Sequence, residues 1–175
     1  GSPFRNRAMA ITVLPSYVGA IQLSDIGTDG IAIDYNEGSG AQYVGQYGSV
    51  PDPFFTYRPV NGTIYIYGSF GHFGAPDLSG HPSAQYITGI TSWGTSNPNL
   101  TSLANAFNGG FNGGGSASTY ANDQSTINLP PLPSTVTNLS GMFANCPCDI
   151  TGISSWDLSG VTNTSYMFYQ ARNEL

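Results

Sequence analysis

Val136-Thr-Asn-Leu139-Ser-Gly-Met142-Phe143 has two variant copies in the same half of the chain, and we call each copy an octet. The others read Leu100-Thr-Ser-Leu103-Ala-Asn-Ala-Phe107 and Val161-Thr-Asn-Thr164-Ser-Tyr-Met167-Phe168. The second and third octets begin 25 residues apart (161 minus 136), and the first and second begin 36 apart (136 minus 100). An insertion that starts with the glycine-rich run 109–115 accounts for the longer interval. A period in the twenties predicts a solenoid of the leucine-rich-repeat kind.

A second repeated element precedes two of the octets. Ile87-Thr-Gly-Ile90-Thr-Ser-Trp93 recurs 63 residues later (150 minus 87) as Ile150-Thr-Gly-Ile153-Ser-Ser-Trp156. Its β-branched residues predict an extended strand, while the apolar spacing i, i+3, i+6, i+7 of the octet predicts one face of a short helix. Neither piece can bury its apolar face alone, so the copies must stack. The predicted repeat core consists of Ile87, Ile90, Trp93, Leu100, Leu103, Phe107, Val136, Leu139, Phe143, Ile150, Ile153, Trp156, Val161, Met167 and Phe168.

The first half of the chain predicts a separate β domain. Short runs of β-forming residues, separated by turn residues, cover 11–18, 20–23, 31–35, 41–50, 54–57 and 63–67, and Asn61-Gly62 is a strong hairpin signal. Six such strands predict a small Ig-like sandwich. The fold class is therefore mainly β with short helices, a β-sandwich followed by a short leucine-rich-repeat-type β/α solenoid. We assign residues 1–9 to a leader or tag remnant, 10–75 to the sandwich, 76–86 to a linker and 87–175 to about three repeats.

The last repeat is predicted to have an open edge. Leu175 falls where a further repeat would place its first core residue. Terminal repeats of a solenoid need a polar cap. The sequence therefore predicts that either further copies or another chain covers this edge.

Charge narrows the range of partners. The chain of 175 residues has 4 basic and 10 acidic side chains, a net charge of -6, and only 8% charged residues. Nucleic acids and anionic membranes attract proteins through clusters of Lys and Arg, and this chain has no such cluster. No apolar run is long enough to span a bilayer. We expect neither nucleic-acid binding nor membrane insertion.

The octets also carry a family resemblance. Together with Ser154-Ser-Trp-Asp157, and with Cys146 just after the second octet, they resemble the BspA-like, DUF285-type leucine-rich surface repeats. The first copy departs from that pattern, with Gly94 in place of the Asp and Ala106 in place of the Met. In the first half, Ile33-Asp-Tyr-Asn-Glu-Gly38, Phe55-Thr-Tyr57 and Gly62-Thr-Ile-Tyr-Ile-Tyr67 resemble a PKD-like domain with a divergent turn. The resemblance implies adhesion or recognition at a cell or virion surface rather than catalysis.

Acidic residues in the first half raise the question of a metal. The oxygen-bearing side chains of Asp25, Asp29, Asp34 and Glu37 could serve calcium, which takes six to eight oxygen ligands. The same residues beside glycines are typical of turns, and their spacing fits no EF-hand loop. Turn formation is the favoured interpretation, and calcium is the alternative. We expect no other cofactor.

Aromatic residues supply the candidate binding positions. Tyr65 and Tyr67 alternate with Ile64 and Ile66, so one pair should face outward. Exposed tyrosines give a large contact area at low entropic cost, although cross-strand aromatic pairs would explain them equally well. The candidate binding residues are Tyr35, Tyr43, Tyr47, Tyr65, Tyr67 and, in the glycine-rich insertion, Phe111. That insertion is either part of a binding face or a spacer.

Catalytic chemistry finds little support in the sequence. No paired carboxylates, nucleophile elbow or metal-ligand spacing is present, and the adjacent thiols Cys146 and Cys148 suggest buried structural cysteines. We expect a non-catalytic recognition or adhesion module for protein or glycan on a cell surface. The alternative is a structural virion or phage-tail component that contacts neighbouring assembly subunits.

Overall fold

The structure is a computed structural model, and its side chains are described for most of the second half and for the central strands of the first. The described residues are 7–14, 21–34, 42–45, 48–51, 62–78, 80, 82–94, 97, 99–109, 111–112, 116–117, 126–169 and 171, with the backbone alone for 42–45, 48–51, 82–83, 111–112 and 116–117.

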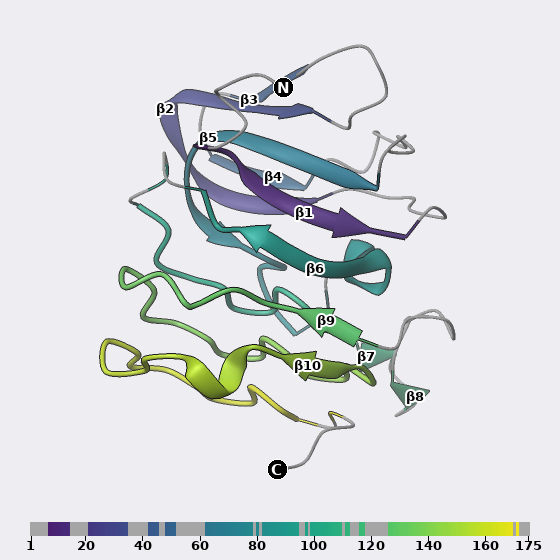
Figure 1. Ribbon diagram of the computed structural model, residues 1–175. Coiled ribbons are helices and arrows are strands. Elements are labelled where there is room, and N and C mark those ends of the chain that lie inside the picture. The colour runs from purple at the N-terminus through teal and green to yellow at the C-terminus, as the bar shows by residue number, and fades with distance from the viewer. Residues whose placement is uncertain are drawn as a thin grey trace.

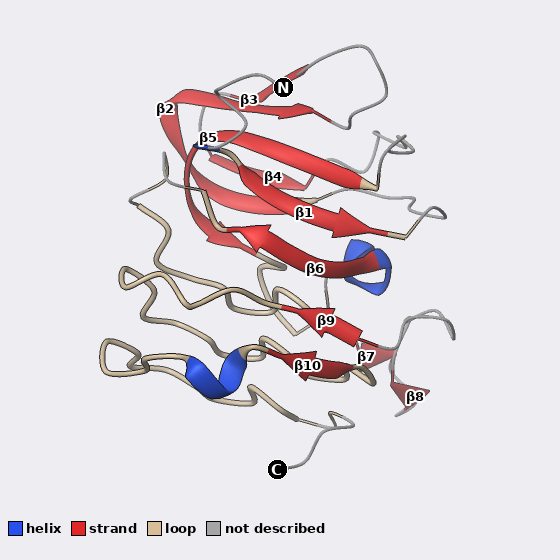
Figure 2. Cartoon of the chain, in the orientation of Figure 1, coloured by secondary structure: helices blue, strands red, loops and turns tan. Residues whose placement is uncertain are grey.

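Strands make up most of the regular secondary structure in the described part of the chain, and loops and turns connect them (Figure 2). In chain order they are β1 (Met9–Val13), β2 (Gln22–Asp34), β3 (Gln42–Gly45), β4 (Gly48–Pro51), β5 (Thr63–Phe73), β6 (Ile87–Ser92), β7 (Phe111–Asn112), β8 (Ser116–Ala117), β9 (Thr126–Asn128) and β10 (Asp149–Thr151). The described helices are two short 3-10 turns, η2 (Pro82–Tyr86) and η3 (Ile153–Ser155). None of the helical segments described has both the length and the hydropathy that a membrane-spanning helix needs.

One mixed sheet joins the two halves of the chain (Figure 1). Its order is β10-β9-β6-β1-β5-β2-β3, with β4 paired to β2 beside β3. The pairs within β1 to β6 are antiparallel, whereas β6, β9 and β10 run parallel to one another. β6 is the junction, because one of its edges bonds β1 of the first half and the other bonds β9 of the second.

Side-chain alternation explains the antiparallel part. Met9 pairs with Ile66 and Ile11 with Ile64, and all four side chains are buried. Gly62 begins the turn into β5 with φ 70°, a left-handed conformation that glycine adopts without strain, and its carbonyl accepts the Val13 N–H at 2.9 Å. The strong turn signal at Asn61-Gly62 thus leads into a strand, as the sequence predicts.

The sequence predicts a sandwich domain, a linker and a repeat domain, whereas one sheet contains strands from both halves of the chain. Apart from the β7–β8 ribbon, every described strand belongs to that sheet, so the described residues show no second sheet opposite it. Residues 82–86 of the predicted linker form η2, and Ala8 and Met9 of the predicted leader are buried. Buried apolar side chains from both halves form one continuous cluster.

The octets form a second ladder beside the sheet. Ser102, Asn138 and Asn163, each the third residue of its octet, are joined by parallel bridges, and His72 of β5 continues the row. The N–H groups of every second residue in the second octet donate to carbonyls of the third: Leu139 to Asn163, Gly141 to Ser165 and Phe143 to Met167, each at 2.8 Å. The first octet donates to the second in the same way, Leu103 to Asn138, Asn105 to Ser140 and Phe107 to Met142.

The prediction of a helix in each octet is wrong, and the ladder gives the reason. The alternate N–H groups bond three residues back inside the octet, as Met142 does to Leu139 at 3.2 Å, so the chain makes consecutive turns. The Asn138 side-chain oxygen accepts the Ser140 N–H at 2.9 Å, a local bond by which Asn competes with helix formation. A helix would satisfy these groups internally and leave none for the neighbouring octet.

The octet pattern follows from these contacts. The residue in the second position is a threonine whose hydroxyl reaches back along the ladder, as Thr162 Oγ1 does to the Thr137 carbonyl at 3.3 Å. The last position holds a phenylalanine, and the rings stack with centroids 5.6 Å apart for Phe107 and Phe143 and 5.5 Å for Phe143 and Phe168. Cys146 and Cys148 are buried, as predicted, and are not joined by a disulfide.

Candidate functional site

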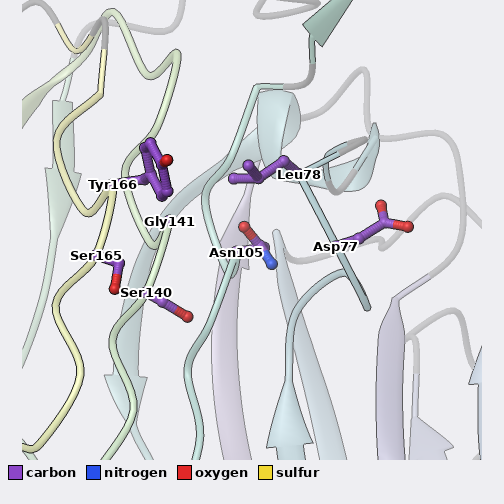
Figure 3. A pocket seen from close by; sticks show the side chains of 7 residues that line it. All are labelled: Asp77, Leu78, Asn105, Ser140, Gly141, Ser165 and Tyr166. Carbon is purple, nitrogen blue, oxygen red and sulfur yellow. The ribbon is translucent and has the colours of Figure 1, made fainter.

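A surface hollow of about 500 Å³ crosses all three octets (Figure 3). Asn105, Gly141 and Tyr166, which line it, share the sixth octet position, and Ser140 and Ser165 share the fifth. Asp77 and Leu78, from the segment after β5, complete the wall. Because the octets are in register, the residues at the fifth and sixth octet positions lie side by side and form a continuous strip along the hollow.

The sixth position has an unusual backbone. Asn105, Gly141 and Tyr166 have φ angles of 59°, 62° and 58°, so each lies in the left-handed region. Glycine and asparagine adopt this conformation readily, but for a bulky residue it is strained. Such strain costs about 1–3 kcal/mol and is concentrated at functional sites. Tyr166 is therefore the one sixth-position residue that the turn geometry alone does not explain.

Apolar side chains stand at the rim of the hollow. Tyr166 is 61% exposed, and Leu78 is 43% exposed. In Figure 3 the Tyr166 ring and the Leu78 side chain lie at the same end of the hollow. Tyr169 packs its ring edge-on against Tyr166, with centroids 5.8 Å apart and an interplanar angle of 84°. This neighbour supports the ring while leaving most of it accessible.

Polar groups line the rest of the hollow. The buried Asn105 amide donates to the Ala75 carbonyl at 3.4 Å and accepts from Asn108 at 3.1 Å, so it is held in place. Ser165 Oγ donates to Asn163 at 2.5 Å and keeps its lone pairs for an incoming hydroxyl. The Ser140 hydroxyl has no partner among the described residues. The hollow thus combines an aromatic ring with neutral hydrogen-bonding groups and one carboxylate, that of Asp77.

The candidate binding tyrosines from the sequence lie elsewhere. Tyr65 and Tyr67 are half-buried on β5, on the face opposite to the buried Ile64 and Ile66. Tyr35 and Tyr47 lie outside the described residues, and for Tyr43 and Phe111 only the backbone is described. Tyr65 and Tyr67, the two whose side chains the structure describes, do not line the hollow.

The candidate calcium residues do not converge in the described part of the chain. Asp25 and Asp29 are exposed on β2, whereas Asp34 is buried at its end, and Glu37 lies outside the described residues. No group of three or more His, Cys, Asp or Glu side chains placed to hold a metal ion occurs among the residues described.

The predicted repeat core is buried in a graded way. Its members in the first two octets, together with Ile87, Ile90 and Trp93, are buried. In the third repeat only Met167 is buried, while the others are partly exposed: Ile150, Ile153, Trp156, Val161 and Phe168. Burial therefore falls in the repeat that has a described neighbouring repeat on one side only.

The two tryptophans make equivalent hydrogen bonds, although Trp93 is buried and Trp156 is partly exposed. The indole N–H of Trp93 donates to the Pro131 carbonyl and that of Trp156 to the Pro130 carbonyl, both at 2.9 Å. The chain between the two tryptophans contains a further strand of the same kind, β9, followed by Pro130 and Pro131. The sequence did not predict this strand, because the two prolines replace the recurring Ile-Thr-Gly-Ile pattern. Ile127 of β9 is aligned with Ile150 in the parallel β9–β10 pair and is fully buried.

One carboxylate of the repeat has a perturbed pKa. Asp157, exposed after η3, accepts the backbone N–H of Ser159 at 2.9 Å, and this bond, supported by the Ser159 side chain, lowers the pKa of the Asp157 carboxyl. The bond closes a local turn rather than preparing an acid or base.

Sequence comparisons identify the second half of the chain. Residues 82–174 match the family described as "Mycoplasma protein of unknown function, DUF285". No curated protein and no solved structure matches the chain. The match covers the strand elements and all three octets but not the part that resembles a PKD-like domain. Since the matched residues make up more than half of its length, this chain belongs to the DUF285 family.

Proposed function

We propose that this protein is a non-catalytic recognition module that binds a glycan or protein through the hollow at Tyr166. The observation that supports the proposal is the left-handed backbone of Tyr166, whose φ of 58° carries a large and mostly exposed side chain. At the same octet position Gly141 would meet the turn's needs without strain. Strain that the fold does not require is better explained by a contact that the ring makes.

The chemistry of the hollow favours a glycan over a protein segment. A sugar ring has an apolar C–H face that packs on an aromatic ring, and an edge of hydroxyl groups that exchange hydrogen bonds with amides, hydroxyls and carboxylates. Tyr166 offers the ring, and Ser140, Ser165 and Asp77 offer the polar partners. A hollow of about 500 Å³ has the size of an ordinary small-ligand site.

A glycan array followed by titration calorimetry tests this function. We expect the wild-type protein to bind a defined glycan, and Tyr166→Gly to lose that binding while keeping its thermal stability. Tyr169→Phe is the matched control, because it retains the ring that packs against Tyr166. Glycan binding that survives in Tyr166→Gly would contradict the proposal. Binding to purified proteins with no binding to any glycan would show that the ligand is a protein.

The repeats support a finer description of the architecture. The second half is a short leucine-rich-repeat-type solenoid of the BspA-like kind, in which each repeat contributes a parallel strand and an octet of consecutive turns. The aligned β6, β9 and β10 on one side and the bridged octets on the other support this description. We further propose that the first half is a divergent PKD-like domain, on the resemblance of its sequence.

Location and the second candidate function follow from the same features. A recognition module with few charged residues suits an extracellular, cell-surface or virion-surface setting, with no role in nucleic-acid binding, membrane insertion or catalysis. The alternative, a structural virion or tail component, is favoured by the incompletely covered third repeat. Electron microscopy would separate the two, because a structural component forms ordered assemblies, whereas an adhesion module decorates a surface.

A further inference from the structure

The floor of the Tyr166 hollow contains a hydrogen-bond acceptor in a fixed orientation. The Ala75 carbonyl can only accept, so the side-chain nitrogen of Asn105 faces it at 3.4 Å and the side-chain oxygen faces the other way. In Figure 3 that oxygen lies on the Gly141 side of the Asn105 side chain. A Cβ on Gly141 would collide with the same oxygen and would lie 3.1 Å from Leu78 Cδ2. Because Gly141 has no Cβ, Asn105 Oδ1 takes the place of a side chain in the floor.

Two further amides prevent the Asn105 side chain from turning over. The Asn108 amide donates to Asn105 Oδ1 at 3.1 Å, and the Asn145 amide donates to Asn108 Oδ1 at 3.4 Å. All three asparagines are buried. A flipped Asn105 would set its nitrogen against the Asn108 nitrogen and its oxygen against the Ala75 carbonyl, so two buried hydrogen bonds would be lost. Asn108 uses one lone pair of Asn105 Oδ1, and the second can accept from a ligand.

The charge of the hollow also favours ligands that donate hydrogen bonds. Asp77 stands at the opposite end of the hollow from Tyr166 and contributes a carboxylate (Figure 3). None of the described residues that line the hollow is Lys, Arg or His. The hydroxyls of Ser140, Ser165 and Tyr166 can either donate or accept, so they do not oppose this preference. The net charge of -6 on the whole chain adds a field that repels anions.

We infer, on the basis of the glycan binding proposed above, that the hollow selects glycans without acidic groups. A neutral or amino sugar presents hydroxyl or ammonium donors to Asn105 Oδ1 and to the Asp77 carboxylate, while its C–H face packs on Tyr166. A sialic acid, a uronic acid or a sulfated sugar instead brings a second anion to a site whose described lining has no cation. Removing an anion from water without a partner is costly. Asn105 is thus the specificity-determining residue, and Asn108 and Asn145 are its positioning residues.

A glycan array that carries each neutral glycan beside its sialylated, uronate and sulfated derivatives tests this selectivity. The wild-type protein should bind the neutral members at least about fivefold more tightly at low salt, the factor expected for two like charges about 4 Å apart in water. Added salt should reduce this ratio, because it screens the repulsion. Asp77→Asn should narrow the ratio and Asp77→Lys should reverse it. Asp29→Asn, which removes an exposed charge of β2 outside the lining of the hollow, is the matched control and should leave the ratio nearly unchanged.

Deoxy and deoxyfluoro analogues of the sugar that binds best test the acceptor in the floor. Neither analogue can donate at the substituted position, so replacement of the hydroxyl that reaches Asn105 Oδ1 should weaken binding about fivefold in both. Asn108→Ala releases the Asn105 side chain and should reduce this loss, a change in selectivity that general destabilisation would not produce. The analogues are measured on the wild-type protein, so their result stands even where Asn108→Ala does not fold.

Three results would overturn the inference. These are equal or tighter binding of the acidic derivatives, a ratio that Asp77→Lys does not move, and deoxy analogues that bind as well as the parent sugar at every position. Acidic glycans that bind the wild-type protein but not Tyr166→Gly would overturn the selectivity alone and leave the proposed function standing. Absence of binding to any glycan would overturn both.

Discussion

Phe143 and Phe168 stack with ring centroids 5.5 Å apart and planes 14° from parallel, yet only Phe143 is fully buried. The difference arises because Phe107 covers the other face of Phe143, whereas no described ring covers the other face of Phe168. Stability should therefore be graded along the ladder.

Alanine substitutions in the phenylalanine stack measure this gradient. Phe143→Ala should lower the free energy of unfolding by about 3–5 kcal/mol, because it removes a fully buried ring and leaves a cavity. Phe168→Ala should cost about 1–2 kcal/mol, because part of its ring is already in water. Chemical denaturation of both variants gives the comparison. Equal losses would mean that Phe168 is covered in solution.

The sixth octet position predicts opposite effects for two small substitutions. Gly141→Ala should destabilise the protein by more than about 1 kcal/mol, because its Cβ would strain a φ of 62° and collide with Asn105 Oδ1. Tyr166→Gly should leave the stability unchanged or raise it by up to about 1 kcal/mol, because it relieves the same strain. Thermal unfolding of the two variants tests this, and a large loss in Tyr166→Gly would show that the ring supports the fold.

His72 closes the ladder with its side chain. Its Nε2 must donate, because the Ala104 carbonyl can only accept, and in the neutral ring Nδ1 then accepts from Ser24 Oγ at 3.1 Å. His72→Ala should cost about 1–3 kcal/mol by leaving that carbonyl unpaired. Ser24→Ala is the milder control, since it removes only the outer bond. Equal stability of His72→Ala and wild type in urea denaturation would contradict this role.

The turn at Asp157 predicts a small pH dependence. Because the pKa of the folded carboxyl is lowered, its contribution to stability is present above the unfolded pKa and is lost as the pH falls through the folded pKa. The melting temperature of Asp157→Asn, which keeps an oxygen acceptor without the charge, should differ from that of wild type at neutral pH and converge with it in acid. A difference that is constant with pH would exclude the carboxylate as its source.

The sequence predicted what depends on side-chain type and missed what depends on the backbone. The alternation of Tyr65 and Tyr67 with Ile64 and Ile66 corresponds to an observed strand, and the octets were recognised by their recurrence. The apolar spacing of the octet suggested a helix because consecutive turns repeat apolar residues at nearly the same interval. The hydrogen bonds between octets are made by backbone N–H groups, which every residue type except proline carries. The amino-acid sequence therefore could not indicate them.

The candidate site shows the same limit. Tyr166 was visible within the third octet, but its role depends on a φ angle and on the alignment of three octets that lie far apart in the chain. One signal was available: Asn105 and Gly141, residues that favour left-handed turns, stand at the position that Tyr166 fills. The strand at Ile127 was missed because Pro130 and Pro131 break the pattern by which the other two copies were recognised.

The closure of the ladder by β5 gives the molecule a polarity. Because β5 already bonds the Ser102 and Ala104 carbonyls of the first octet, no further octet can pair with that edge of the ladder. Two copies of this chain therefore cannot join by placing the third octet of one copy against the first octet of the other.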